Sequence, residues 1–484
     1  LYHRYQLTNN SIDMEQAKRS LRDKPLARWG ALALISLTMF FAYMFVDVLS
    51  PLKTLLETEL GWDSTVFGLY GGSEFFLNVF VGFLIFAGII LDKMGVRFTA
   101  LLSGSFMVIG ALIKVYALSA TFRNGGPGYD AINSFSSSIH GITGWNLPPT
   151  ALCACLGFML FGCGTEMAGV TVSRAIVKWF KGKEMAFAMG VEMSLARFGV
   201  FAIFRLSPWL AEKFESVQAP VIFCALLLCI GLLLYVVYWF MDKALEKDLE
   251  GEEVEEEEEP FKFSDLGKVF GSGVFWVVAI LCVLYYSAIF PFQKFATEML
   301  HYKVGFDTKD AAAYFSYFPI GAMFVTPPLG LYLDLKGKGA TMLILGSILM
   351  IVCHLTFALY PFEPGTTSST IVAMSAIVLL GISFSLVPAT LWPSVPKLID
   401  NKVLGSAYSA IFWIQNVGLM SVPIIIGSIL DSVNKGVPEG QPKDYTLAML
   451  VFASFGVIAL LMSLFLKALD SKKHYGLELP NVKQ

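Results

Sequence analysis

Apolar runs of about 20 residues, each long enough to cross a bilayer as a helix, recur along almost the whole chain. In lipid every backbone polar group must be satisfied internally, which restricts spanning segments to helices and closed barrels. Only 15% of the 484 residues are charged, whereas a soluble globular protein carries roughly 25%. The pattern therefore predicts an all-α membrane protein with many spans.

We predict twelve transmembrane helices from these runs, with bounds uncertain by a few residues. The first six cover 28–50, 64–91, 98–121, 149–178, 184–206 and 218–241. The second six cover 271–297, 308–334, 339–361, 369–396, 404–430 and 445–467.

The spans fall into two halves separated by an acidic stretch. We expect an N-terminal six-helix bundle at 28–241 (the first half) and a C-terminal bundle at 271–467 (the second half). The linker at 242–270 contains the run GEEVEEEEEP, which repels itself and is typical of a solvated spacer. Lys and Arg gather in the tails at 1–27 and 468–484 and in the turns after even-numbered spans. Because cytoplasmic loops carry excess basic residues, both tails are predicted to be cytoplasmic.

A short motif occupies the same place in each half. Gly88, Asp92 and Gly95 follow the second span, and Gly330 and Asp334 follow the eighth with the same Gly-to-Asp spacing. Two related halves around an axis along the membrane normal are expected of major facilitator transporters. The repeat thus predicts two pseudo-symmetric six-helix bundles, the major facilitator fold.

The first copy of the motif also carries Lys93 and Arg97, and GIILDKMGVR resembles the major facilitator signature between helices 2 and 3. The resemblance implies that these motif residues form a cytoplasmic gate that holds the two halves together. Positive-inside charges beside a turn would explain the basic residues, but not the repeat in the second half.

Two opposite charges interrupt long apolar stretches. Glu166 lies in LGFMLFGCGTEMAGVTV and Arg197 in AFAMGVEMSLARFGVFAIF. Counting 1.5 Å per residue places Glu166 about 18 Å and Arg197 about 20 Å from the cytoplasmic ends of their helices, just beyond the membrane midplane. Such charges usually face a bundle interior or a water-filled cavity. They would suit a small zwitterion, with its ammonium on Glu166 and its carboxylate on Arg197. An internal salt bridge that merely fixes two helices is the alternative.

Further polar residues are weaker candidates for the same site. Tyr70, Glu74 and Asn78 are spaced four apart and form a polar stripe on the second span. Glu74 could carry a proton or simply bond a neighbouring helix. Asp47, near the outer end of the first span, is expected to be a helix-end or entrance residue.

The second half offers aromatic and amide side chains but no comparable midplane charge. We expect Tyr286, Trp392, Tyr408, Gln415 and Asn416 to contribute to the substrate site. Aromatic walls and amides from the second half would then complement charge recognition by the first.

Several blocks resemble the major facilitator domain-containing protein 1 family, which includes a lysosomal dipeptide transporter. They are WFKGKEMAFAMGVEMSLAR at 179–197, YYSAIFPF at 285–292, LWPSVPKLI at 391–399 and LGSAYSAIFWIQNVGL at 404–419. The resemblance covers nearly all twelve helices and fails in the tails, the 122–148 loop and the linker. It implies transport of dipeptides by alternating access, with Glu166, Arg197, Gln415 and Asn416 matching family positions. Glu74 has no counterpart in that pattern.

The sequence thus predicts a membrane transporter of dipeptides or similar small zwitterions, not an enzyme, with no cofactor, metal site or nucleic-acid partner. The alternative is a proton-coupled transporter of small organic anions that uses Arg197, with Glu166 or Glu74 as proton carrier. A receptor or scaffold would need a large ordered surface outside the membrane. Uniport and proton-coupled transport, with or without an accessory subunit, remain alternatives at this point.

The membrane in which the protein resides is inferred from two features of the N-terminal tail. The tail lacks an acidic dileucine sorting signal, and the single Asn-x-Ser/Thr sequon, at Asn9, lies on the predicted cytoplasmic side. These features favour a bacterial inner membrane over a lysosomal membrane.

Overall fold

The computed structural model describes residues 20–181, 183–249, 262–438 and 441–480, where every regular element is a helix. Eleven helices in this described part are long and apolar enough to cross a membrane. Residues 250–261 of the linker, which contain the acidic run, and residues 1–19, with the sequon at Asn9, lie outside it.

The helices follow the predicted spans closely. In the first half they are α2 (Pro25–Val46), α3 (Lys53–Leu60), α4 (Ser64–Ser73), α5 (Phe76–Phe80), α6 (Phe83–Ala117), α7 (Ala120–Arg123), α8 (Tyr129–Thr143), α9 (Pro149–Phe180), α10 (Met185–Lys213) and α11 (Gln218–Asp248). From the end of the linker onward they are α12 (Leu266–Phe270), α13 (Gly273–Met299), α14 (Thr308–Phe315), α15 (Tyr317–Lys336), α16 (Gly339–Leu359), α17 (Thr367–Leu398), α18 (Leu404–Val433) and α19 (Thr446–Lys473).

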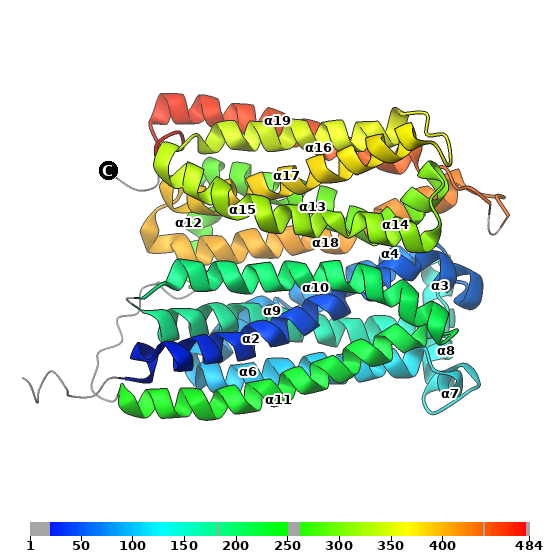
Figure 1. Ribbon diagram of the computed structural model, residues 1–484, viewed down its shortest axis with the longest axis horizontal. Coiled ribbons are helices and arrows are strands. Elements are labelled where there is room, and N and C mark those ends of the chain that lie inside the picture. Colours follow the sequence, from blue (N-terminus) through cyan, green and yellow to red (C-terminus); the bar gives the residue numbers. More distant parts are fainter. Residues whose placement is uncertain (1–19, 182, 250–261, 439–440, 481–484) are drawn as a thin grey trace, which may run out of the picture.

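The long helices lie side by side in two groups. Figure 1 shows α13 and α15–α19 in the upper part of the molecule and α2, α6 and α9–α11 in the lower part. The start of α2 and the end of the chain lie at the left, which we call the terminal end. Helices α3, α7 and α8 lie at the right, which we call the loop end.

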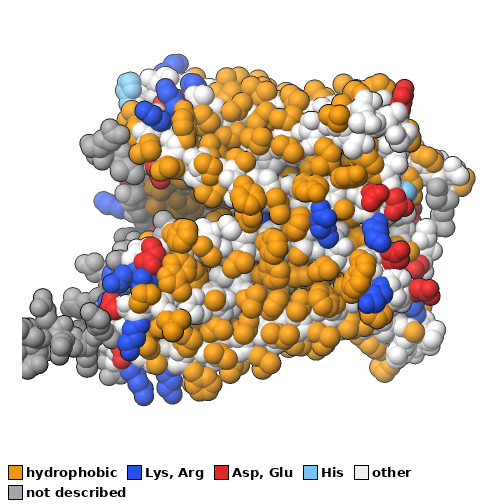
Figure 2. All heavy atoms as spheres, viewed as in Figure 1, with side chains coloured by type: hydrophobic (Ala, Val, Ile, Leu, Met, Phe, Trp, Pro, Cys, Tyr) orange, Lys and Arg blue, Asp and Glu red, His pale blue; other side chains and the backbone are white. Residues whose placement is uncertain are grey.

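The surface is divided as a bilayer would require. Figure 2 shows most charged side chains gathered at the terminal and loop ends, with a hydrophobic band over the long helices between them. Large exposed residues of the long helices α11 and α19 include Leu233, Phe240 and Leu461, each at least 60% exposed. Apolar residues exposed in such numbers match a lipid-facing surface.

The second passage is broken where the sequence predicted one continuous span. It runs through α4, α5 and the start of α6, and the chain reverses inside α6 at Gly95, whose backbone (φ 76°, ψ 169°) is not helical. Helix α9 shows the reversal, because its earlier part meets Glu74 through Gly162 and Gly110 through Gly157, whereas Asp92, which lies between these two in sequence, meets Arg174 near the end of α9. The predicted helices 64–91 and 98–121 thus share α6, and the broken passage adds a twelfth crossing to the eleven long helices.

The expected loop at 122–148 is also more regular than predicted. It contains α8, whose Ser136 hydroxyl donates to the carbonyl of Leu147. Its Gly- and Ser-rich composition gave no clear apolar period, which is why the sequence indicated a loop.

Close packing between the broken passage and its neighbours depends on glycine. A Cβ on Gly72 of α4 would collide with the Met420 carbonyl of α18, and one on Gly162 of α9 would collide with the Glu74 carbonyl. Small residues at such crossings let helix backbones approach closely in membranes.

This packing makes a prediction for two glycines on α9. Gly162→Ala should destabilise the protein by about 1–3 kcal/mol, because the added methyl overpacks a backbone contact. Gly169→Ala is the matched control, since a Cβ there meets nothing within 4 Å. Thermal unfolding in detergent measures both, and equal melting temperatures for the two variants would contradict this packing.

Candidate functional site

Glu166 and Arg197 lie at similar heights in the molecule. Fourteen residues of α9 follow Glu166 and twelve residues of α10 precede Arg197, which places them about 21 and 18 Å from the terminal end. Both side chains are half-buried. Neither makes a hydrogen bond or an ion pair with any described residue, so the internal salt bridge considered from the sequence is not formed in this structure.

The Arg197 guanidinium rests on aromatic rings of the second half. Its central carbon lies 4.6 Å from the Phe384 ring centroid and 5.7 Å from that of Phe290. Stacking uses the face of the guanidinium and leaves its N–H groups, which point out along the edge, able to donate. The contact therefore holds a cation across the two halves while its donors stay available.

Tyr43 of α2 lies near several of these charges. Its half-buried side chain lies within Coulombic range of Arg197, Glu192, Glu166 and Glu74. Tyr43 is thus influenced electrostatically by three carboxylates and one guanidinium of the first half.

The aromatic residues predicted from the second half lie together. The Trp392 indole donates to the Tyr286 hydroxyl at 3.0 Å, and the Tyr408 hydroxyl donates to the Trp392 carbonyl at 3.3 Å. Tyr286 stacks on Phe290 with the centroids 5.6 Å apart, which joins this group to Arg197.

The two predicted amides are more deeply buried. The Gln415 side-chain carbonyl accepts a hydrogen bond from the Cys282 thiol at 3.2 Å, and this bond links Gln415 to α13. Asn416, 2% exposed, leaves its amide nitrogen without a hydrogen-bond partner among the described residues. It belongs to the face of α18 that meets the broken passage, because Trp413, one turn away, donates to the Val79 carbonyl at 2.9 Å.

A buried lysine that the sequence analysis missed contacts the predicted polar stripe. Lys114 of α6 is completely buried, donates to the Tyr70 hydroxyl at 2.6 Å and lies 3.9 Å from the centroids of both Phe45 and Phe158. Tyr70 is therefore engaged in a closed aromatic cage. Lys114 interrupts an apolar run as visibly as Glu166 does, and that interruption could have identified it.

Glu74 lies at the break in the second passage, where α4 ends. Its side chain is 6% exposed, and one carboxylate oxygen has no hydrogen-bond partner among the described residues. Lys294, Asp47, Glu166 and Lys114 are the charged groups within Coulombic range. Discontinuous helices with polar groups at the break are typical of transporter sites.

The loop end is closed by charged contacts between the halves. Lys294 of α13 donates to Asp47 of α2 at 3.0 Å, and the Gln293 amide donates to the same carboxylate. Asp47 is thus a buried contact between the halves. Lys294 is a buried charge of the second half that was not predicted, and it lies nearer the loop end than the midplane.

A second group of charges continues this closure outward. Lys53 of α3 lies 2.6 Å from Glu298 of α13, while Lys443, before α19, contacts both Glu57 and Glu298. The Tyr445 hydroxyl donates to Glu298. Buried charges bonded this way are costly to separate, so the loop end is held shut.

The terminal end is hollowed between the same two groups of helices. Figure 2 shows a recess there, lined mainly by hydrophobic atoms. The predicted gate motif borders this end without crossing it, since Asp92 pairs with Arg174 at 3.2 Å and Arg97 pairs with Glu246, all in the first half. Lys93 is exposed, and Cβ atoms on Gly88 or Gly330 would meet nothing within 4 Å.

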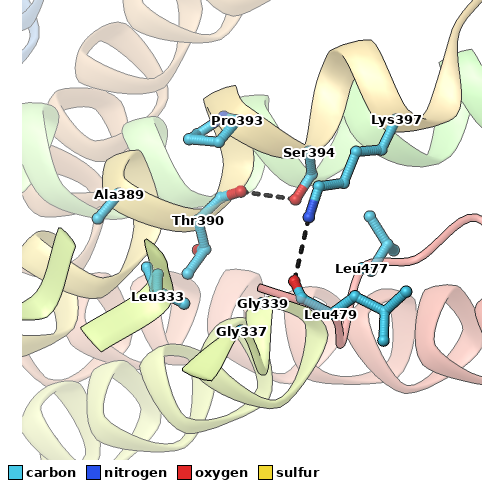
Figure 3. A pocket seen from close by; sticks show the side chains of 10 residues that line it. All are labelled: Leu333, Gly337, Gly339, Ala389, Thr390, Pro393, Ser394, Lys397, Leu477 and Leu479. Atoms are coloured by element: carbon cyan, nitrogen blue, oxygen red, sulfur yellow. Dashed lines mark hydrogen bonds between the residues drawn. The ribbon is translucent and has the colours of Figure 1, made fainter. Parts of the chain in front are cut away.

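Asp334 of the second motif follows Leu333, which lines a narrow seam between α17 and the C-terminal residues Leu477 and Leu479. Figure 3 shows Lys397 of α17 donating to the Leu479 carbonyl, at 3.3 Å, beside Gly337 and Gly339. The seam encloses only about 10 Å³, too little for a peptide. A larger cavity of about 420 Å³ lies at the loop end, lined by parts of α3, α10 and α14.

Residues 32–423 match the Major Facilitator Superfamily, and the chain belongs to it. It is a multi-pass membrane transporter of that superfamily. The fold agrees, because a mutant form of the nucleoside transporter NupG superposes with a TM-score of 0.65 at 13% identity, covering 90% of this chain and 99% of the NupG chain.

Two transporters are similar to this chain in sequence. The human protein "Lysosomal dipeptide transporter MFSD1" is 29% identical over 403 residues, which cover 81% of this chain and 78% of the relative. The "Probable sulfoacetate transporter SauU" of Cupriavidus necator is 23% identical over 93% of this chain and 96% of its own length. The resemblance inferred from the four sequence blocks is thereby confirmed.

Two carboxylates from different halves cap the start of α4. Asp63 accepts from the Val66 amide at 2.8 Å, while Asp431 of α18 accepts from the amides of Ser64 and Thr65 at 3.0 and 2.6 Å. Burial, together with the neighbouring Asp431 carboxylate, raises the pKa of Asp63 to about 6 from an ordinary value of 3.8.

This cap predicts that acid favours closure of the loop end. A carboxyl with a raised pKa in the closed state binds its proton more tightly there than when solvated. Closure should therefore strengthen as the pH falls from about 6 to 4, by at most about tenfold per pH unit. Spin labels at Glu215 and Asp310, in a background without native cysteines, would report the distance between the halves.

Asp63→Asn should remove most of this pH dependence, because the amide does not titrate. A distance distribution that does not change with pH in the unsubstituted protein, or an unchanged response in Asp63→Asn, would contradict the role of this carboxyl.

Proposed function

We propose that the protein transports dipeptides, or similarly small zwitterions, across the membrane. The observation that carries the proposal is the absence of any hydrogen bond or ion pair to Glu166 and Arg197 among the described residues. A charge in the middle of a membrane costs about 3 kcal/mol or more and usually serves a function. The similarity to a dipeptide transporter supports a substrate with two opposite charges.

In this proposal each end of the substrate meets one of these groups. Arg197 binds the carboxylate through the edge of its guanidinium, in the bidentate geometry that arginine favours. Glu166 binds the ammonium. Gln415, Asn416, Tyr70 and Glu74 remain predicted contributors, and the buried Asn416 amide and Glu74 carboxylate are the best placed of these to gain a partner when the halves move.

The distribution of contacts supports alternating access. The loop end is held by Asp47–Lys294 and Lys53–Glu298, whereas the terminal end is hollowed. We propose that the terminal end faces the cytoplasm and that Asp92 and Arg97 exchange their present partners for second-half residues when that end closes. A rocking motion about a central site is common to transporters built from repeats.

A second candidate function is transport of a small organic anion on Arg197, with Glu166 or Glu74 as proton carrier. The similarity to a probable sulfoacetate transporter favours this alternative. It differs in one testable respect, since an organic anion needs no ammonium.

Uptake into proteoliposomes separates the two functions. Labelled Ala-Ala should enter, and unlabelled dipeptides should compete, whereas N-acetylated or C-amidated peptides and sulfoacetate should compete poorly. Glu166→Gln and Arg197→Ala should each lower uptake at least tenfold, because losing one side of a desolvated charge pair costs about 2–5 kcal/mol.

Glu215→Gln is a suitable control, because it makes the same chemical change at an exposed carboxylate of the loop end that is outside the predicted substrate site. Size-exclusion profiles would show that each variant folds. Competition by sulfoacetate but not by dipeptides would favour the anion transporter and contradict the proposal.

A further inference from the structure

A row of aromatic side chains begins at Arg197 and extends along the second half. Phe290 and Phe384 contact the guanidinium, and Tyr286 stacks on Phe290. Trp392 donates to the Tyr286 hydroxyl, which continues the row to α17.

Two rings of α18 complete the row. The Phe412 ring stacks on Trp392 with the centroids 4.7 Å apart, and the Tyr408 centroid lies 6.0 Å from Trp392. We call Tyr286, Phe290, Trp392, Tyr408 and Phe412 the aromatic wall.

The aromatic wall is partly open, unlike the packed rings behind it. Phe412 is 37% exposed and its other four members are half-buried. Tyr285, the neighbour of Tyr286, is instead completely buried and donates to the Leu343 carbonyl at 2.6 Å. Apolar packing alone would not require the wall to keep its rings accessible.

The wall faces the first half and leads inward from the terminal end. It faces the first half because Arg197, which comes from α10, lies directly on Phe290. Trp392 lies six residues before the end of α17, and Tyr408 lies four residues after the start of α18, so both are about 6–9 Å from the terminal end. A ligand held by Arg197 would therefore lie farther from the terminal end than Trp392 and Tyr408 do.

We propose that the aromatic wall binds the side chain of the residue whose carboxylate meets Arg197, so that preferred substrates are dipeptides with a large apolar or aromatic C-terminal residue. The inference rests on the proposed function. Carboxylate and side chain branch from one Cα atom, so fixing the carboxylate on Arg197 brings the C-terminal side chain to the adjoining rings. The N-terminal side chain would lie nearer Glu166 and the polar groups of the first half.

Binding of Ala-Ala, Ala-Phe and Phe-Ala to the purified protein tests this inference without any substitution. Burying a phenyl ring against the wall should make Ala-Phe bind about tenfold or more tightly than Ala-Ala. Phe-Ala should stay within about threefold of Ala-Ala. Equal affinities for Ala-Phe and Ala-Ala, or a preference for Phe-Ala over Ala-Phe, would overturn the inference.

Substitution in the wall provides the second arm. Phe412→Leu and Trp392→Leu should each lower the Ala-Phe to Ala-Ala affinity ratio by about threefold or more, because the flat ring surface is lost. Phe465→Leu on α19 is the matched control, since that ring is 52% exposed and outside the wall, and its ratio should stay unchanged.

An unchanged ratio in both wall variants would also overturn the inference. That failure is distinct from failure of the proposed function, in which none of the three dipeptides would bind or be transported.

Discussion

The cost of leaving opposite charges unpaired inside a membrane bundle governs this structure. Glu166 and Arg197 project from long helices at similar heights, yet neither meets a described hydrogen-bonding or ionic partner. By contrast, the buried charges Asp47 and Lys294 at the loop end pair with each other. Asp47 and Lys294 are thus paired within the fold and hold the loop end shut. Glu166 and Arg197 are left for a ligand to pair with.

The second half contacts Arg197 through aromatic rings rather than through a counter-charge. Phe384 and Phe290 support the guanidinium of Arg197 from across the interface between the halves. This contact fixes the cation in position without using its N–H donors. A ligand carboxylate would then bind a group that is already oriented, which limits the entropy lost on binding.

Sequence reasoning predicted the helices well because each span is a separate, strongly apolar run. It could not predict the break between α4 and α6, since helix ends there depend on how Gly72 and Gly82 pack and turn. The heights of Glu166 and Arg197 followed from counting residues, whereas their lack of pairing depends on rotations of α9 and α10. Lys114 was not predicted, because the candidate site was defined by one pair of opposite charges at matching depth. The pairing of Asp47 with Lys294 joins residues too distant in sequence to relate by spacing.

The central claim is that Glu166 binds the substrate ammonium while Arg197 binds the carboxylate. A double-mutant cycle tests it most directly, by measuring affinities of Ala-Ala and N-acetyl-Ala-Ala for the unsubstituted protein and for Glu166→Gln. The account predicts that acetylation weakens binding strongly in the unsubstituted protein and little in Glu166→Gln, with a coupling of about 1.5 kcal/mol or more. Equal penalties for acetylation in both proteins would contradict it.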